Sequence, residues 1–294
     1  MNPGYAPAKV NLWLHVGRRR KDGYHDLASL IVFALDAGDT VTAAHGDTLT
    51  LEISGPEGVA LAGADNLVLK AARALARAAD EHNPGARLTL NKTLPIASGL
   101  GGGSADAAAA LRLLNGLWEL DWPLDRLAQV AEGVGADVPV CVWSLPAAVE
   151  GKGERVEPLS AWPELYAVLV NPRLPVATAE VFARYDAGDR TKPHSMRLPL
   201  GLTGMREAVT LIRQGTNDLE PPARAIQPAI GEVLAVLEQE GSCLLARMSG
   251  SGASCFGLYE SQQAAAQAAA RMSQARPDWW VRATRLSGCD REQI

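Results

Sequence analysis

Alternating apolar and polar positions near the start of the chain predict a strand over residues 9–16. The apolar set is Val10, Leu12, Leu14 and Val16, and the set between them is Lys9, Asn11, Trp13 and His15. Successive side chains of a strand point to opposite faces, so the pattern predicts a half-buried strand. It also places Lys9 and Asn11 on one side, where both can contact the same ligand.

Helical patterns occur in both halves of the chain. Residues 67–79 are rich in alanine and leucine after Asp65 or Asn66, either of which suits an N-cap, and residues 105–117 contain mostly strong helix formers. Apolar spacing predicts a helix after Pro123 that breaks at Gly135, so Asp137 falls at a joint. Further helices are expected over residues 230–240 and 261–276, the latter as a covering helix.

Strand candidates alternate with these helices, and the order predicts a mixed α+β fold. The candidates are runs at 87–91, 166–170, 244–248, 255–259 and 281–286, while residues 27–35 form a second apolar stretch. Residues 18–23 are expected to form a polar turn and residues 186–204 a surface loop. We place a domain boundary near residue 158, which gives domains of 1–158 and 159–294.

Composition narrows the class of protein. The chain has 294 residues, 47% hydrophobic and 21% charged, which fits two globular domains with a cleft between them. A formal net charge of -5 argues against general nucleic-acid binding. The cysteines Cys141, Cys243, Cys255 and Cys289 have neither metal-site spacing nor disulfide density, so reduced, packed thiols are expected. Without a signal core or an apolar run near ~18 residues, the expected location is the cytoplasm and not a membrane.

A glycine-rich segment, PIASGLGGGSADAAAA at 95–110, connects the strand at 87–91 to the helix at 105–117. Glycines let backbone N–H groups approach a phosphate, and a helix N-terminus adds partial positive charge there. The pattern therefore predicts an anion site, with a flexible turn as the alternative. Its spacing fits neither the Walker-A loop nor the dinucleotide-binding GxGxxG motif.

Three motifs occur together and in order: PAKVNL at 7–12, GLGGGSADAA at 99–108 and SGSGASCF at 249–256. This set resembles the GHMP kinase family over nearly the whole chain. GYH at 23–25, DNL at 65–67 and GADVP at 135–139 are similar to a branch whose acceptor substrate carries cytidine diphosphate.

The resemblance implies transfer of the ATP γ-phosphate to a hydroxyl of that small-molecule substrate, in the non-mevalonate route to isoprenoids, with magnesium as a second cofactor. It implies a two-domain α+β fold, an N-terminal ribosomal-protein-S5-like α/β domain and a C-terminal ferredoxin-like α+β domain. The oligomeric expectation is a monomer or weak homodimer.

Two catalytic residues follow from the resemblance. Asp137 would accept the proton of the substrate hydroxyl or orient that hydroxyl, and the alternative is a helix cap. Lys9 would keep Asp137 ionised and counter charge on the transferring phosphoryl group, whereas an isolated lysine is usually only solvated.

Substrate contacts are expected at both ends of the chain. Tyr24 would stack on the cytosine, His25 would hydrogen-bond to it, and Phe182 would lie on its opposite side, with Thr178 nearby. The full substrate set is Asn11, Tyr24, His25, Thr178, Phe182, Gly250 and Gly252. The two glycines would allow close approach to phosphates or substrate, with a tight hairpin turn as the alternative. The charge run at 18–21 is interpreted as a solvated loop.

The expected ATP-binding residues follow the glycine segment. They are Asn66, Lys92, Pro95, Ile96, Ala97, Ser98, Gly99, Leu100, Gly101, Gly102, Gly103, Ser104 and Ala105. For Asn66 the alternative to a nucleotide contact is a helix cap, and for Lys92 it is a surface charge. Ala105 stands where the family commonly has a second hydroxyl residue, so Ser104 acts alone, and Asp106 either caps the helix or helps hold magnesium. The metal ligands stay open.

Two other functions remain at this point. One is a sibling GHMP kinase acting on mevalonate, homoserine or a sugar, against which Tyr24, His25 and Phe182 argue because only a cytidine-bearing substrate needs an aromatic clamp. The other is a non-catalytic nucleotide-binding relative, against which Lys9 and Asp137 argue, since a binder needs no proton acceptor.

Overall fold

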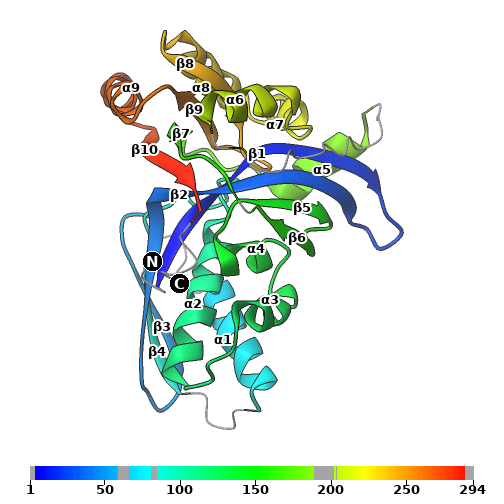
Figure 1. Ribbon diagram of the computed structural model, residues 1–294, viewed down its shortest axis with the longest axis vertical. Coiled ribbons are helices and arrows are strands. Elements are labelled where there is room, and N and C mark those ends of the chain that lie inside the picture. Colours follow the sequence, from blue (N-terminus) through cyan, green and yellow to red (C-terminus); the bar gives the residue numbers. More distant parts are fainter. Residues whose placement is uncertain are drawn as a thin grey trace.

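A long antiparallel hairpin of β1 (Tyr5–Arg19) and β2 (His25–Ala44) runs through the middle of the computed structural model. In Figure 1 these two blue strands cross between one group of helices, α1 to α4, and a second group, α6 to α9. The structure describes residues 4–58, 66–80, 85–159, 161–188, 202 and 204–288. The predicted cap Asp65, most of the loop expected at 186–204, and Cys289 lie outside these residues.

The described strands form one mixed sheet. Its main path runs β3–β4–β2–β10–β7–β9–β8, with β1 and β5 also pairing with β2, and β6 with β5. The bounds are β3 Leu49–Ser54, β4 Ala86–Asn91, β5 Ala147–Gly151, β6 Arg155–Pro158, β7 Leu165–Asn171, β8 Cys243–Met248, β9 Cys255–Tyr259 and β10 Trp280–Ser287. Every predicted strand is confirmed and the apolar stretch at 27–35 lies within β2, whereas β3, β5 and β6 were not predicted.

The sheet is continuous between the two halves of the chain. Leu286 and Ser287 of β10 pair with Ala34 and Phe33 of β2, and the rest of β10 pairs with β7. A backbone ladder therefore joins elements on either side of residue 158, and the division there stays a prediction.

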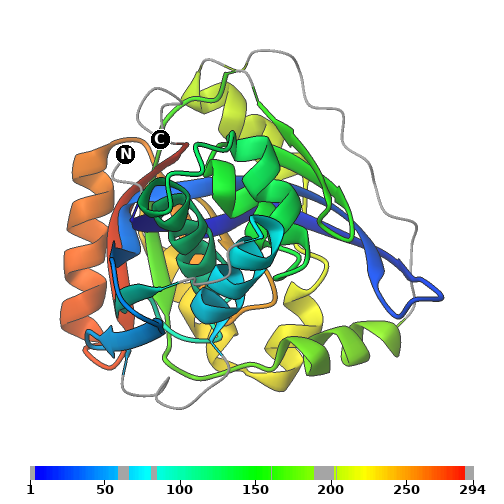
Figure 2. The ribbon, with the colours of Figure 1, turned by 90° about the horizontal axis from the view of Figure 1, so that it is seen from below.

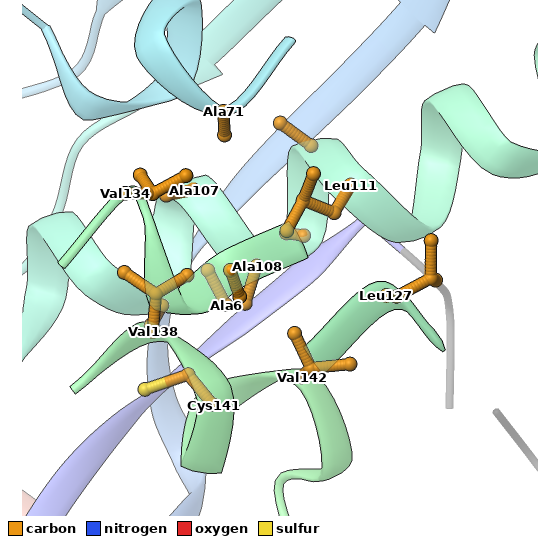
Figure 3. Packing of buried hydrophobic residues seen from close by; sticks show 14 of the residues in the cluster. Ala6, Ala71, Ala107, Ala108, Leu111, Leu127, Val134, Val138, Cys141 and Val142 are labelled. Carbon is orange, nitrogen blue, oxygen red and sulfur yellow. The ribbon is translucent and has the colours of Figure 1, made fainter. Parts of the chain in front are cut away.

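Helices α1 (Leu67–Ala78), α2 (Gly102–Leu117), α3 (Leu124–Glu132) and α4 (Val138–Trp143) pack together on the first half of the sheet. Small side chains allow this: Ala107 and Ala108 of α2 lie against Leu111, Val138 and the neighbouring helices (Figure 3). The side chain of Asn66 caps α1 by accepting from the Val68 N–H at 2.8 Å. The predicted helices are confirmed, although α2 begins three residues before the predicted start.

The second half contributes α5 (Thr178–Asp186), α6 (Met205–Gln214), α7 (Glu220–Ile226), α8 (Ala229–Gln239) and α9 (Gln262–Ala275). The predicted helices α8 and α9 are confirmed, and α9 covers β7 and β10 as expected. Seen from below in Figure 2, α9 lies along one edge of the molecule while α5 lies near the β1–β2 hairpin.

The half-buried character predicted for the first strand is wrong. Every residue of β1 from Ala6 to Val16 is buried, because helices and sheet cover both sides. A register shift between Asn11 and Trp13 also breaks the alternation, so that Leu12 and Leu14 enter different core clusters. The predicted proximity of Lys9 and Asn11 is confirmed, since the Lys9 Nζ donates to Asn11 Oδ1 at 2.9 Å.

Candidate active site

A cavity of about 1030 Å³ lies between the glycine segment, the β1–β2 hairpin, α5 and the loop before β9. Most of the predicted site residues line it: Lys9, Asn11, Tyr24, His25, Asn66, Lys92, Pro95, Ile96, Ala97, Ser98, Gly99, Gly101, Gly102, Gly103, Ser104, Asp137, Thr178, Phe182 and Gly250. Residues far apart in sequence thus face one space. Their roles stay predictions.

The glycine segment ends in a helix N-terminus that faces the cavity. Gly99 and Gly101 have φ of 77° and 62°, a left-handed conformation that favours glycine. Gly101 is the N-cap of α2 and supplies no side-chain cap, while Gly102, Gly103 and Ser104 line the cavity. The first N–H groups of a helix have no partner within it, so they are available to an anion here.

Leu100 and Ala105 belong to the predicted ATP set but do not line the cavity. Both side chains are buried, Leu100 in the central core and Ala105 on the side of α2 that faces the core of the first half. The Leu100 carbonyl accepts a hydrogen bond from the Lys9 N–H at 2.8 Å. Through this bond Leu100 connects the glycine segment to the strand that carries Lys9.

Lys9 and Asp137 form an ion pair at the cavity wall. The Lys9 Nζ lies 3.1 Å from Asp137 Oδ2, and the side chains are 5% and 47% exposed respectively. The ammonium is therefore held in the protein, while the carboxylate is open to a ligand. Lys9 also lies directly under the glycine segment, because a Cβ placed on Gly101 would be 2.9 Å from Lys9 Cε.

Asp137 occupies the N-cap position of α4, but its side chain makes no capping hydrogen bond. Its position at the joint is as predicted, and the alternative interpretation as a helix cap holds for its backbone position but not for its side chain. The carboxylate pairs with Lys9 instead, which leaves it directed at the cavity rather than at the helix backbone.

A buried ionic cluster lies beneath the glycine segment. The Lys92 Nζ donates to Asp39 Oδ2 at 2.5 Å and to Asp106 Oδ2 at 2.7 Å, and all three side chains are at most 4% exposed. The interpretation of Lys92 as a surface charge is therefore wrong. A Cβ on Gly102 would be 2.9 Å from the same Nζ, so the lysine supports the start of α2 from within.

The two carboxylates of this cluster differ in their surroundings. Asp39 Oδ1 accepts from the Thr93 and Leu94 N–H groups at 2.6 and 2.9 Å, whereas Asp106 Oδ1 is buried with no hydrogen-bond partner. Burial is the main cause that raises the pKa of the Asp106 carboxyl to about 7, against the opposing effect of Lys92. Asp106 is not the cap of α2, so the helix-cap alternative is wrong for it too.

The loop before β9 is hydrogen-bonded to the glycine segment. The Ser249 hydroxyl donates to the Gly99 carbonyl at 3.0 Å and accepts from the Asn11 N–H at 3.1 Å. The Ser254 N–H donates to the Ser98 carbonyl at 2.9 Å. A Cβ on Gly99 would be 2.3 Å from the Ser249 carbonyl oxygen, so the two backbones are in direct contact.

The two glycines of this loop, Gly250 and Gly252, have different surroundings. Gly250 lines the cavity, and a Cβ there would be 2.9 Å from the Gly99 carbonyl oxygen. Gly252 is not part of the cavity lining, and a Cβ there would be 2.8 Å from the Met248 sulfur. Gly252 packs against Met248 and against Gly99 of the glycine segment, and its predicted contact with substrate stays a prediction.

The far end of the cavity is aromatic. Tyr24 is 56% exposed, while the buried His25 ring stacks on Phe182 with centroids 4.9 Å apart. The Thr178 hydroxyl lies 2.8 Å from the Ser251 hydroxyl, which connects α5 to the loop before β9.

Several cavity residues were not predicted. Lys152 lies with its Nζ 5.3 Å from the centre of the Tyr24 ring, and Asp186 lies 2.8 Å from His25. Arg19, which the charge-run interpretation left out of the site, also lines the cavity. Only the charge run gave a signal, since Lys152 and Asp186 look like ordinary surface residues in the sequence.

Comparison with known proteins identifies the family. The family described as GHMP kinases N terminal domain matches residues 66–144, and GHMP kinases C terminal matches residues 202–278. The chain belongs to the GHMP kinases, a family of small-molecule kinases whose members use ATP. Within that family, the curated relatives that it matches over nearly full length are 4-diphosphocytidyl-2-C-methyl-D-erythritol kinases.

The relative from Paramagnetospirillum magneticum is 48% identical over 286 residues, which cover 96% of this chain and 97% of the relative. The one from Azorhizobium caulinodans is 49% identical over 290 residues, covering 96% and 97%. A crystal structure of 4-(cytidine 5'-diphospho)-2C-methyl-D-erythritol kinase matches with a TM-score of 0.75 and 34% identity, covering 97% of this chain and 99% of that one. Homoserine kinase from Cytophaga hutchinsonii, at a TM-score of 0.70 and 20% identity over 97% and 94%, shares the fold. The α+β fold expectation is confirmed.

Proposed function

We propose that this protein transfers the γ-phosphate of ATP to the 2-hydroxyl of 4-diphosphocytidyl-2-C-methyl-D-erythritol. The observation that carries the proposal is the Lys9–Asp137 pair, which lies directly beside Gly101 of the glycine segment in the same cavity as the aromatic group. Relatives nearly half identical over almost the whole chain bear the name of this kinase.

The ion pair supports an in-line phosphoryl transfer. Asp137, with about half of its side chain exposed, accepts the proton of the substrate hydroxyl or orients that hydroxyl toward the phosphorus. Lys9 is fixed by Asn11 and Asp137, so its ammonium faces the developing charge without having to reorganise. Positioning and electrostatics then supply most of the acceleration, as in phosphoryl transfer generally.

The nucleotide is placed by the glycine segment and α2. Its phosphates lie at the α2 N-terminus, where Gly102, Gly103 and Ser104 present backbone N–H groups. Asn66 contacts the nucleotide from the start of α1. Lys92 acts on the site from below, through the buried cluster, because its ammonium already donates to two carboxylates.

The residues present fit a magnesium ion. Mg²⁺ takes one or two protein oxygens together with phosphate oxygens. Asp106 Oδ1 is buried without a partner in the cavity wall, and the Ser104 side chain lines the same wall. These two groups would hold the ion beside the phosphates, where it would neutralise charge on the transferring group.

The substrate occupies the opposite end. Tyr24 and Phe182 contact the cytosine, His25 hydrogen-bonds to it, and Arg19 and Lys152 balance the charge of the diphosphate. Since a mevalonate or homoserine substrate carries no base, this end of the cavity favours the cytidine-bearing substrate.

The test is ADP release by the purified protein with the cytidine substrate, mevalonate and homoserine. ADP release is expected with the cytidine substrate and not with mevalonate or homoserine. Asp137→Asn should abolish turnover while ATP still binds, and Lys9→Ala should lower kcat more than it weakens ATP binding. Matched controls are Asp125→Asn, an exposed carboxylate beside Trp143, and Lys21→Ala in the hairpin turn. Near-normal turnover in Asp137→Asn would remove that residue from the mechanism.

We also propose a cytoplasmic monomer or weak homodimer without nucleic-acid partners. Among the helices that the structure describes, none has the length and apolar character to span a bilayer. The acidic net charge of -5 supports small-molecule rather than nucleic-acid partners. Sedimentation at several protein concentrations would measure the oligomeric state.

A further inference from the structure

The His25 ring is held by a carboxylate from another element of the cavity lining. His25 begins β2, and its Nε2 lies 2.8 Å from Oδ1 of Asp186, the last residue of α5. The two residues are 161 positions apart in the chain. The same helix supplies the ring of Phe182, stacked at 4.9 Å, and that of Tyr185, edge-on at 6.2 Å. Three side chains of α5 thus determine the plane and position of one imidazole.

The location of Asp186 is electrostatically unfavourable for a carboxylate. A helix C-terminus carries partial negative charge, so an acidic residue there is usually destabilising. Arg19 Nε lies 4.0 Å from Asp186 Oδ2, but its side chain is 62% exposed, and an exposed pair of this kind contributes little. The contact with His25, at 2.8 Å, is much shorter than the one with Arg19.

The contact determines which ring nitrogen carries the proton. An ionised carboxylate only accepts hydrogen bonds, so the His25 Nε2 must donate to it. In the neutral ring Nδ1 is then an acceptor. Within the described part of the chain, Nδ1 has no hydrogen-bond partner, and His25 is part of the cavity wall.

We propose that Asp186 is a specificity-determining positioning residue, which holds the proton of His25 on Nε2 so that Nδ1 offers an acceptor to the 4-amino group of cytosine. This inference rests on the proposed function. Uracil has a carbonyl oxygen at that position, so its lone pair would face the lone pair of His25 Nδ1 and the two would repel. A site that hydrogen-bonds one group discriminates strongly against an analogue that lacks it.

The experiment compares CDP and UDP binding to the full-length protein by calorimetry. The wild type should bind CDP more tightly than UDP. Asp186→Ala should reduce this preference about tenfold, which corresponds to the loss of roughly one hydrogen bond. Asp186→Asn should retain most of it, because its amide oxygen still accepts from Nε2–H.

Asp26→Ala is the matched control, since it removes an exposed carboxylate of the same hairpin that contacts Arg20 rather than His25. It should leave the CDP preference unchanged. Nitrogen-15 NMR of the His25 ring supplies a readout that general loss of structure does not imitate. The Nε2–H tautomer is expected in the wild type and Asp186→Asn, and a mixture of tautomers in Asp186→Ala.

An unchanged CDP preference in Asp186→Ala would overturn the inference, as would a wild-type ring with its proton on Nδ1. In turnover assays, Asp186→Ala should raise KM for the cytidine substrate with little change in kcat. A wild-type protein that phosphorylates the cytidine substrate while Asp186→Ala keeps its CDP preference refutes only this role. A wild-type protein that does not phosphorylate it refutes the proposed function itself.

Discussion

Gly101→Ala is expected to impair catalysis because Gly101 has a left-handed backbone conformation and packs against Lys9. Its φ is 62°, and an alanine in that left-handed region costs roughly 1–2 kcal/mol. The added Cβ would lie 2.9 Å from Lys9 Cε and 3.1 Å from Lys9 Cβ. The second contact is close to the backbone, so rotation at the end of the lysine side chain cannot relieve it.

The size of the expected fall in kcat follows from how far Lys9 must move. To reach ordinary van der Waals distance, Lys9 or the loop must move by several tenths of an ångström, and a misplacement of ~1 Å can lower a rate by about 10²-fold. We therefore expect kcat to fall roughly 10- to 100-fold in a coupled ADP assay. The free energy of unfolding should fall by about 1–2 kcal/mol in denaturant melts.

Gly103→Ala is the matched control in the same segment. Its φ is not in the left-handed region, and the nearest atom to the added Cβ is Leu67 Cδ1 at 3.5 Å, an ordinary contact. Alanine in a helix is better than glycine by about 0.5–1 kcal/mol, so this variant should be at least as stable as the wild type. A Gly101→Ala protein that lost stability but kept the wild-type kcat would refute the idea that this loop positions Lys9.

Three further predictions concern other parts of the site. Because its pKa is raised, the Asp106 carboxyl keeps its proton in the folded protein at pH values where the unfolded chain, with a pKa of 3.8, releases it. The free energy of unfolding should therefore fall as pH rises from 3.8 to about 7. Denaturant melts across that range should show a smaller fall in Asp106→Asn. Ser249→Ala leaves the buried Asn11 N–H unpaired and should cost about 1–3 kcal/mol of unfolding free energy in the same assay. Tyr24→Ala should raise KM for the cytidine substrate without changing KM for ATP, which initial-rate kinetics would separate.

Local patterns were sufficient to predict most elements of the fold. The alanine run predicted α2, but its start at Gly102 was missed because glycine is a poor helix former and its close packing against Lys92 does not show in the local pattern. Alternation correctly placed Lys9 beside Asn11. The half-buried character it predicted was wrong because both faces of β1 are covered, and the register shift between Asn11 and Trp13 leaves no mark in the apolar pattern.

Residues that line the cavity could be predicted where they belong to a sequence motif. They could not be predicted where their position depends on a partner far away in the chain. Lys92 was recognised as part of the site, but its burial depends on Asp39, 53 positions away. Asp186 contributes through His25, 161 positions away, and no local pattern connects the two. Pairings of that range come from the sheet topology, which brings α5 to the β1–β2 hairpin.

The position of β10 in the sheet has a consequence for the order of folding. This strand lies between β2 and β7, yet it follows every other described strand and helix in the chain. The contacts between β2 and β10 therefore span almost the full length of the sequence, and such long-range pairing forms slowly. During synthesis on the ribosome, the two walls of the cavity acquire their shared ladder only after residue 287 has emerged, so ATP affinity should develop at the end of translation rather than with the glycine segment.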